Sequence, residues 1–364
     1  MTHRESRFLR IVLLLILVLP AVGGDSSGQL SSRIDQIMQA RSGTGEFSGV
    51  ALVARRDRVV YRHAFGLANR EWNIPNDLDT KFEIGSITKQ FTAMLILQLV
   101  NENKIRLEGH VSDYLPYYRQ DTGTQIRISE LLSHTSGVPS FTSLPGFLDG
   151  PESRTHYGVQ EFVKKYCSGN LEFVPGTKFD YSNSGYFLLG AVLEQVSGKS
   201  YQELLQERIF GPLGMKNSGY THTETLIPHR AAGYERTSSG FQNARFYDMS
   251  IPFSAGALYS TVGDLFLWDQ ALYREDLLPA KLRDLIFKPN LEGYGYGWVM
   301  LVPASATPYA GESIPMHGGA IFGFQSLIQR IIGHRELIVL LDNNDDPKLL
   351  DIALEIRRAL ADNP

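Results

Sequence analysis

The feature that most constrains this chain is the separation of its strand patterns, which stand near both ends and leave a long helical stretch between them. Residues 49–54 and 58–64 are rich in apolar and β-branched side chains, and only three residues join them, the length of a hairpin connection. Residues 295–301, 324–331 and 336–341 have the same character. Because hairpin connections make neighbouring strands antiparallel, these segments predict one antiparallel sheet closed by both ends of the chain.

Apolar residues at helical spacing predict the elements around this sheet. They recur over 30–39 before the first strand and over 88–100 and 185–196 in the middle of the chain. Pro347 then opens a last helix, because proline is favoured at the first helical position. We therefore expect one helix at each end of the chain and a helical block between them.

The predicted fold class is α+β: an antiparallel sheet flanked by N- and C-terminal helices, with a mainly helical lobe inserted. We place the sheet lobe at about 29–80 and 290–364, and the helical lobe at about 81–289. Large crevices commonly lie between two such lobes, so a functional site is expected there.

The N-terminal segment 1–24 has the pattern of a secretory signal peptide. Its start carries four basic side chains, His3, Arg4, Arg7 and Arg10. The apolar run over 11–19 is shorter than the roughly 20 residues that span a bilayer, and small residues follow it. We predict cleavage and export to the periplasm or the exterior, with a mature domain over 25–364. An uncleaved membrane anchor is the alternative.

Composition excludes several classes of function. The net charge is −4 and the Lys and Arg residues are scattered, so no basic surface for nucleic acid is expected. The single cysteine, Cys167, cannot form an intramolecular disulfide, and it follows a segment typical of a helix end. There is no His-Glu-x-x-His motif and no cluster of histidines, so neither a metal nor another cofactor is expected. The expected partner is a small-molecule or peptide substrate, with no membrane contact after leader removal.

The first candidate for chemistry is Ser86 followed by Lys89. If a helix begins at Ser86, the two side chains share one face, with Cβ atoms roughly 5–6 Å apart. A serine hydroxyl is a weak nucleophile that needs a base, and a lysine can be that base only if burial and positive neighbours lower its pKa from about 10.4. Taken alone, the pair is equally typical of a helix-capping serine and a surface lysine.

The second candidate is Tyr181 with Asn183, in a loop that leads into a helix. A phenol there could pass a proton between nucleophile and leaving group, and an amide could bind a substrate carbonyl and contact the lysine. Taken alone, the pattern also fits an asparagine that stabilises a turn beside a half-buried tyrosine.

The third candidate is His317-Gly318-Gly319-Ala320, directly before a strand. Glycines let another backbone approach closely, so the N–H of Ala320 could meet the N–H of Ser86 across a carbonyl oxygen and form an oxyanion hole. His317 would add a polar or positive group beside the lysine and the substrate. Taken alone, a β-bulge with an incidental histidine is the simpler interpretation.

In order and spacing the three candidates resemble the active-site motifs of the class C β-lactamase and penicillin-binding-protein family, which are Ser-x-x-Lys, Tyr-x-Asn and Lys- or His-x-Gly. The resemblance covers roughly residues 45–345 and extends to stretches outside the site, at 131–137, 186–190, 209–215, 256–261 and 294–298.

The resemblance implies that Ser86 is the acylated nucleophile and that Lys89 and Tyr181 share general-base and general-acid duty. It also implies that Asn183 orients the substrate. The implied activity is a serine hydrolase acting on a D-amino-acid peptide, a β-lactam or a small ester. A non-turnover penicillin-binding or sensor protein, acylated at the same serine, remains the alternative.

The third motif departs from the family's β-lactamases. The resemblance implies that Gly318, Gly319 and Ala320 line the oxyanion strand, but His317 stands where β-lactamases of this class usually carry lysine. Histidine there is similar to some D-Ala-D-Ala peptidases and β-lactamase-like esterases. Efficient β-lactamase activity is therefore not expected, and the natural substrate and the oligomeric state do not follow from the sequence.

Overall fold

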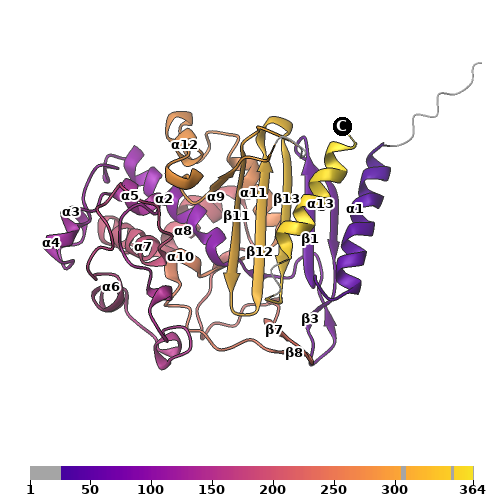
Figure 1. Cartoon of the computed structure of the whole chain (residues 1–364), viewed down its shortest axis with the longest axis horizontal. Helices are drawn as coiled ribbons and strands as arrows, with labels where there is room; N and C mark the ends of the chain where they lie inside the picture. Colours follow the sequence, from indigo (N-terminus) through magenta and orange to yellow (C-terminus); the bar gives the residue numbers. More distant parts are fainter. Residues whose placement is uncertain (1–25, 305–308, 346–347, 364) are drawn as a thin grey trace, which may run out of the picture.

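A six-stranded antiparallel sheet forms the centre of the computed structural model, which describes residues 26–304, 309–345 and 348–363 (Figure 1). The strands lie in the order β10-β11-β12-β13-β1-β2. Their bounds are β1 Gly49–Arg55, β2 Arg58–Ala64, β10 Val299–Leu301, β11 Ile314–Ile321, β12 Phe324–Ile331 and β13 Glu336–Asp342. β1 pairs with β13 from Gly49 opposite Asp342 to Arg55 opposite Glu336, so the two ends of the chain close the sheet. The predicted α+β class is confirmed.

Two terminal helices, α1 (Ser26–Gly43) and α13 (Leu349–Ala361), lie side by side on one face of the sheet (Figure 1). They share a core with β1, in which apolar side chains alternate with those that face the other side of the sheet. This core contains Leu30, Ile34 and Met38 of α1, Ala51 and Val53 of β1, and Ile352, Ile356 and Leu360 of α13. Burial of this apolar surface holds the chain ends together, at about 25 cal/mol per Å² removed from water.

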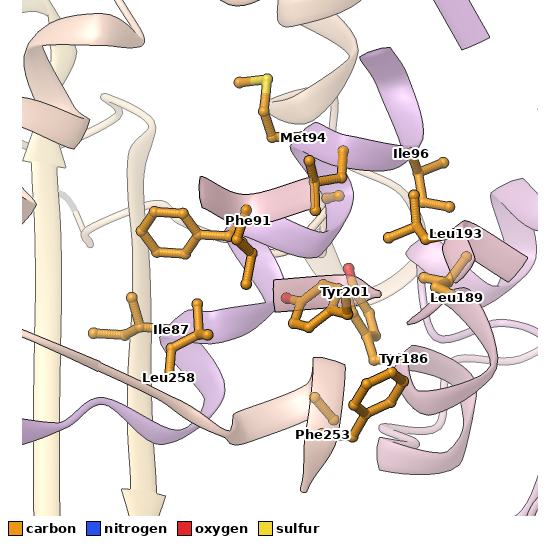
Figure 2. Close-up of a cluster of buried hydrophobic side chains, with 14 of the residues drawn as sticks. Ile87, Phe91, Met94, Ile96, Tyr186, Leu189, Leu193, Tyr201, Phe253 and Leu258 are labelled. Carbon is orange, nitrogen blue, oxygen red and sulfur yellow. The ribbon is translucent and has the colours of Figure 1, made fainter. Parts of the chain in front are cut away.

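The remaining helices come from the chain between β2 and β10, and α2 is the most buried of those that position the site. Every residue of α2 (Thr88–Asn101) from Thr88 to Leu99 is buried. Figure 2 shows its side chains packed among those of α7 and of Tyr201, Phe253 and Leu258. A helix that is buried all round has such a covering on every side, and the covering fixes the position of its N-terminus.

The other helices are α3 Val111–Tyr114, α4 Gln120–Gly123, α5 Ile128–Leu132, α6 Val159–Tyr166, α7 Asn183–Ser197, α8 Tyr201–Leu205, α9 Gly211–Leu213, α10 Phe253–Gly256, α11 Val262–Ala271 and α12 Ala280–Ile286. Short strands form three further small sheets, from β3 Leu67–Asn69, β4 Ile74–Pro75, β5 Phe82–Glu83, β6 Gly219–Tyr220, β7 Tyr234–Thr237, β8 Gly240–Asn243 and β9 Leu258–Ser260.

The helices predicted over 88–100 and 185–196 are confirmed as α2 and α7, and the first helix is longer than predicted. The strand predicted over 295–301 is wrong except for β10. Gly297 has φ +76°, and a Cβ there would lie 2.9 Å from the Cα of Gln90, so this segment turns against the start of α2.

The signal-peptide prediction for 1–24 and the helix start at Pro347 lie outside the described residues. In the described ranges, the helices are too short or too polar to cross a bilayer.

Candidate active site

Ser86 stands at the entrance to α2, in a sharp turn pressed against the sheet. The chain leaves β5, turns through the 3₁₀ segment Gly85–Ile87 and continues directly into α2. Gly85 has φ +49°, and a Cβ there would come 2.7 Å from the backbone nitrogen of Ala320. Only glycine allows this backbone geometry and this close approach to β11. The conformation that Gly85 allows therefore brings Ser86 close to strand β11.

Lys89 lies one turn further along and is fully buried. Its Nζ lies 3.0 Å from Ser86 Oγ, 2.8 Å from Asn183 Oδ1 and 2.8 Å from the carbonyl oxygen of Ala255. Burial away from water disfavours the charged form and holds the pKa of Lys89 well below its usual 10.5.

Tyr181 projects from the loop before α7, and the distance from Lys89 Nζ to its ring centroid is 4.9 Å. Burial raises the pKa of the phenol above 10, and a hydrogen-bonding interaction with Ser86 opposes this shift only in part. The neutral phenol therefore faces the serine hydroxyl.

Asn183 is the first residue of α7, whose N-cap Ser182 accepts the N–H of Gly185 at 3.2 Å. Its Oδ1 accepts from Lys89, and its Nδ2 donates to Thr142 Oγ1 at 3.0 Å. The two partners fix which end of the amide faces the lysine, because the oxygen can only accept and the nitrogen can only donate.

The β11 side of the site consists of backbone. Gly319 pairs with Ser326, whose hydroxyl donates to the carbonyl of Ile84 at 2.8 Å. A Cβ on Gly319 would overlap that same carbonyl oxygen of Ile84. The Gly85–Ser86 turn and the strand at Gly319 and Ala320 are thus in direct contact, with Ala320 exposed beside Ser86.

His317 lies on the same strand, and of the two alternatives predicted for it, a polar or a positive group, its neutral ring fits the polar one. Its Nδ1 donates to the carbonyl of Gly318 at 2.6 Å, and its Nε2 accepts the hydroxyl of Tyr294 at 2.9 Å. Burial, with the nearby Lys89, lowers the pKa of His317 to about 4. Both ring nitrogens are used inside the protein.

A cavity of about 410 Å³ opens in front of Ser86. Asn183 and Ala320 line it together with Ser86, and its apolar lining includes Phe141, Leu148 and Phe322. At the mouth, Arg245 is paired with Asp149 at 2.5 Å and with Glu235 at 3.0 Å, and it stacks on Phe322. The cavity suits a small, largely apolar group next to the serine.

The site residues predicted from the sequence did not include four groups that the structure brings to the site. The Ala255 carbonyl comes from the short helix α10 and the Thr142 hydroxyl from the 3₁₀ turn Phe141–Ser143, and no local pattern predicted either element. Tyr294 fixes His317. His134, a member of the 131–137 stretch, packs against Tyr181 with ring centroids 4.2 Å apart. Its place in that stretch was the one signal that could have found it.

Metal binding has no candidate group in the part of the chain that the structure describes, where His, Cys, Asp and Glu side chains form no cluster of three or more suited to an ion.

The antiparallel sheet closed by terminal helices, with Ser86 and Lys89 at the start of a buried helix, defines the β-lactamase/transpeptidase fold class. Among solved structures, a penicillin-binding protein from Bacillus halodurans superposes with a TM-score of 0.77 at 29% identity, covering 90% of this chain and 98% of that one. The Beta-lactamase family matches residues 34–362, nearly the whole chain. The chain belongs to this family.

Curated relatives agree with this assignment. Penicillin-binding protein 4* of Bacillus subtilis is 30% identical over 83% of this chain and 69% of its own length. A D-aminopeptidase of Gluconobacter oxydans is 28% identical over 87% of this chain and 60% of its own length. The chain thus spans about three fifths to two thirds of these curated relatives.

Proposed function

We propose that this protein is a serine hydrolase that cleaves small amides or esters through an acyl-enzyme on Ser86. The contacts of Lys89 are the observation that carries the proposal. Two of its three partners, Asn183 Oδ1 and the Ala255 carbonyl, can only accept hydrogen bonds. Lys89 Nζ lies 3.0 Å from Ser86 Oγ, within hydrogen-bonding distance. In its neutral form the amine has two hydrogens, which the two obligate acceptors take, and this leaves its lone pair for the proton of the Ser86 hydroxyl.

Acylation follows from this arrangement. As Ser86 Oγ attacks the substrate carbonyl, its proton passes to the lone pair of Lys89, whose lowered pKa makes the neutral amine available. The carbonyl oxygen becomes negative and is stabilised by the N–H groups of Ser86 and Ala320, with Gly318 and Gly319 shaping the strand. The helix N-terminus at Ser86 favours the same negative charge.

Departure of the leaving group needs a proton, which Tyr181 donates. The raised pKa keeps the phenol protonated until the leaving nitrogen or oxygen takes its proton, and Lys89 returns one to it. Water then attacks the acyl-serine while the neutral amine accepts one of its protons. The ester bond to Ser86 Oγ breaks, the serine oxygen takes that proton back from Lys89, and the acid product leaves. Asn183 orients both Lys89 and the substrate, and neutral His317 supports β11 from behind.

The substrate class is supported by the cavity and by the relatives. The cavity of about 410 Å³ is large enough for a small acyl or D-aminoacyl group, and one relative is named a D-aminopeptidase. The absence of a cation at His317 disfavours β-lactams that carry a carboxylate. We also propose export, supported by the leader pattern over 1–24.

A panel on the leader-free protein tests the proposal: a nitrophenyl ester, a D-amino-acid amide, a D-Ala-D-Ala peptide and a chromogenic cephalosporin. We expect a fluorophosphonate to add once to the wild type, at Ser86, and not to Ser86→Ala. Turnover of the ester or amide over many equivalents is expected and excludes a non-turnover penicillin-binding role. No adduct on Ser86, together with full activity in Ser86→Ala, would refute the mechanism.

A further inference from the structure

His134 is buried, and its contacts hold the loop that carries Tyr181. The residue is 1% exposed and has φ +57°, a left-handed conformation that side chains rarely adopt. Such strain persists where the surrounding contacts over-determine it. Burial and the nearby Lys89 and His317 hold its pKa well below 6.5, so the ring is neutral.

The contacts of His134 bracket Tyr181 on both sides. Its carbonyl oxygen accepts the N–H of Asp180 at 2.8 Å, and its ring Nδ1 accepts the N–H of Ser182 at 3.1 Å. These are the residues directly before and after Tyr181. The ring itself lies against the phenol ring, with centroids 4.2 Å apart and planes 36° apart.

The left-handed backbone explains how one residue makes all three contacts. It directs the carbonyl and the ring of His134 toward the same loop, so the two hydrogen bonds clamp the backbone of Tyr181 while the ring limits the phenol. Because Nδ1 accepts, the hydrogen of the neutral ring is on Nε2, which has no hydrogen-bond partner among the described residues. Burial of a polar nitrogen without a partner costs free energy, so packing alone would favour an apolar side chain here.

We propose that His134 is a positioning residue that holds the Tyr181 phenol in the orientation needed to exchange a proton with Ser86, an inference that rests on the function proposed above. A displacement of about 1 Å at such a group can cost on the order of 10²-fold in rate. The loss is expected in the chemical step and not in substrate binding, since the described residues that line the cavity do not include His134.

Two variants of His134 separate its contributions. Asparagine tolerates a left-handed backbone and places an oxygen where Nδ1 lies, so His134→Asn keeps the bond to Ser182 but loses the ring contact. His134→Phe keeps a ring but leaves the buried N–H of Ser182 without its acceptor. His229→Ala is the matched control, because His229 is an exposed histidine with φ +62° whose carbonyl accepts the N–H of Lys81.

The measurement is kcat per fluorophosphonate-titrated site, with KM and the melting temperature, on a nitrophenyl ester. We expect His134→Phe to lose about 10- to 100-fold in kcat per titrated site with KM unchanged, and His134→Asn to retain kcat within about threefold. His229→Ala is expected to match the wild type.

A purely structural role would instead lower the melting temperature and the titrated fraction while leaving kcat per site intact in both variants, and that result would overturn the inference. Equal kcat losses in His134→Asn and His134→Phe would also overturn it. A wild type that is not labelled at Ser86 would point to failure of the proposed function itself.

Discussion

The two walls of the site contribute different kinds of chemical group, one mainly side chains and the other mainly backbone. The helical wall, from α2 and the start of α7, contributes side chains: Ser86, Lys89, Tyr181 and Asn183. The wall formed by β11 contributes backbone, and its one large polar side chain, His317, is bonded to Tyr294 and to the strand itself.

The two walls therefore place different requirements on their amino-acid sequences. On the helical wall the chemical identity of a residue matters, because a proton has to move between defined atoms. On the strand wall, size matters, because a single added methyl group at Gly319 overlaps the Ile84 carbonyl. The predictions below test this contrast, beginning with the largest expected effect.

Removal of the nucleophile should have the largest effect. Ser86→Ala deletes one oxygen from the helical wall and leaves the packing of α2 unchanged, so we expect a loss of at least about 10³-fold in kcat/KM with little change in melting temperature. Steady-state hydrolysis of a nitrophenyl ester and thermal unfolding of the same preparation provide the check. Retained activity would show that the helical wall does not supply the nucleophile.

Gly319→Ala should break the strand wall by size alone. The added Cβ collides with the Ile84 carbonyl and pushes β11 away from Ser86, so we expect a loss of about 10²-fold in kcat and of roughly 1–3 kcal/mol in the free energy of unfolding. Gly318→Ala is the stability control, since the nearest atom to its Cβ is the Ser326 carbonyl oxygen at 3.7 Å. Equal stability losses in both variants would contradict the explanation.

The buried His317 should make the strand wall sensitive to acid. Its pKa is lowered from 6.5 to about 4, so between these pH values the unfolded chain binds more protons and the folded state loses stability as pH falls. The stability that His317 loses through this titration, once the pH is below both pKa values, is on the order of 3 kcal/mol of unfolding free energy, at about 1.36 kcal/mol for each pKa unit.

His317→Gln keeps an acceptor for Tyr294 and removes the titration, so its urea midpoint should fall less than that of the wild type between pH 7 and pH 4. Glu83 acts in the opposite direction, because burial raises its pKa to about 7. The difference between the variant and the wild type, and not the wild-type curve alone, is therefore the measure. Parallel curves for the two proteins would argue against a neutral His317.

Ala320→Ser should have the smallest effect. If the strand wall acts through the N–H of Ala320, a small exposed hydroxyl there should change kcat/KM by less than about threefold. Tyr181→Phe removes one oxygen from the helical wall and provides the contrast on the same substrate. A large loss in the serine variant would mean that the side chain on the strand matters after all.

Much of the arrangement could be predicted from the sequence. Strand patterns at both ends predicted a sheet closed by the chain ends, because apolar and β-branched composition and hairpin spacing are local properties of neighbouring residues. Ser86 and Lys89 stand three residues apart on a helix, so their meeting was likewise a local matter. The failure over 295–301 came from glycines that serve close contacts, Gly297 with the start of α2 and Gly295 with Ile286 of α12, which no local pattern distinguishes from a strand.

Tertiary structure alone decided the protonation and orientation of the site. The pKa of the Lys89 amine is lowered because the fold buries it, and helices α7 and α10, distant in sequence, supply Asn183 Oδ1 and the Ala255 carbonyl to it. In the same way, His317 is neutral and His134 clamps the Tyr181 loop. A residue's identity sets which protons it can carry, but its pKa and direction depend on neighbours that only the folded chain brings within hydrogen-bonding distance.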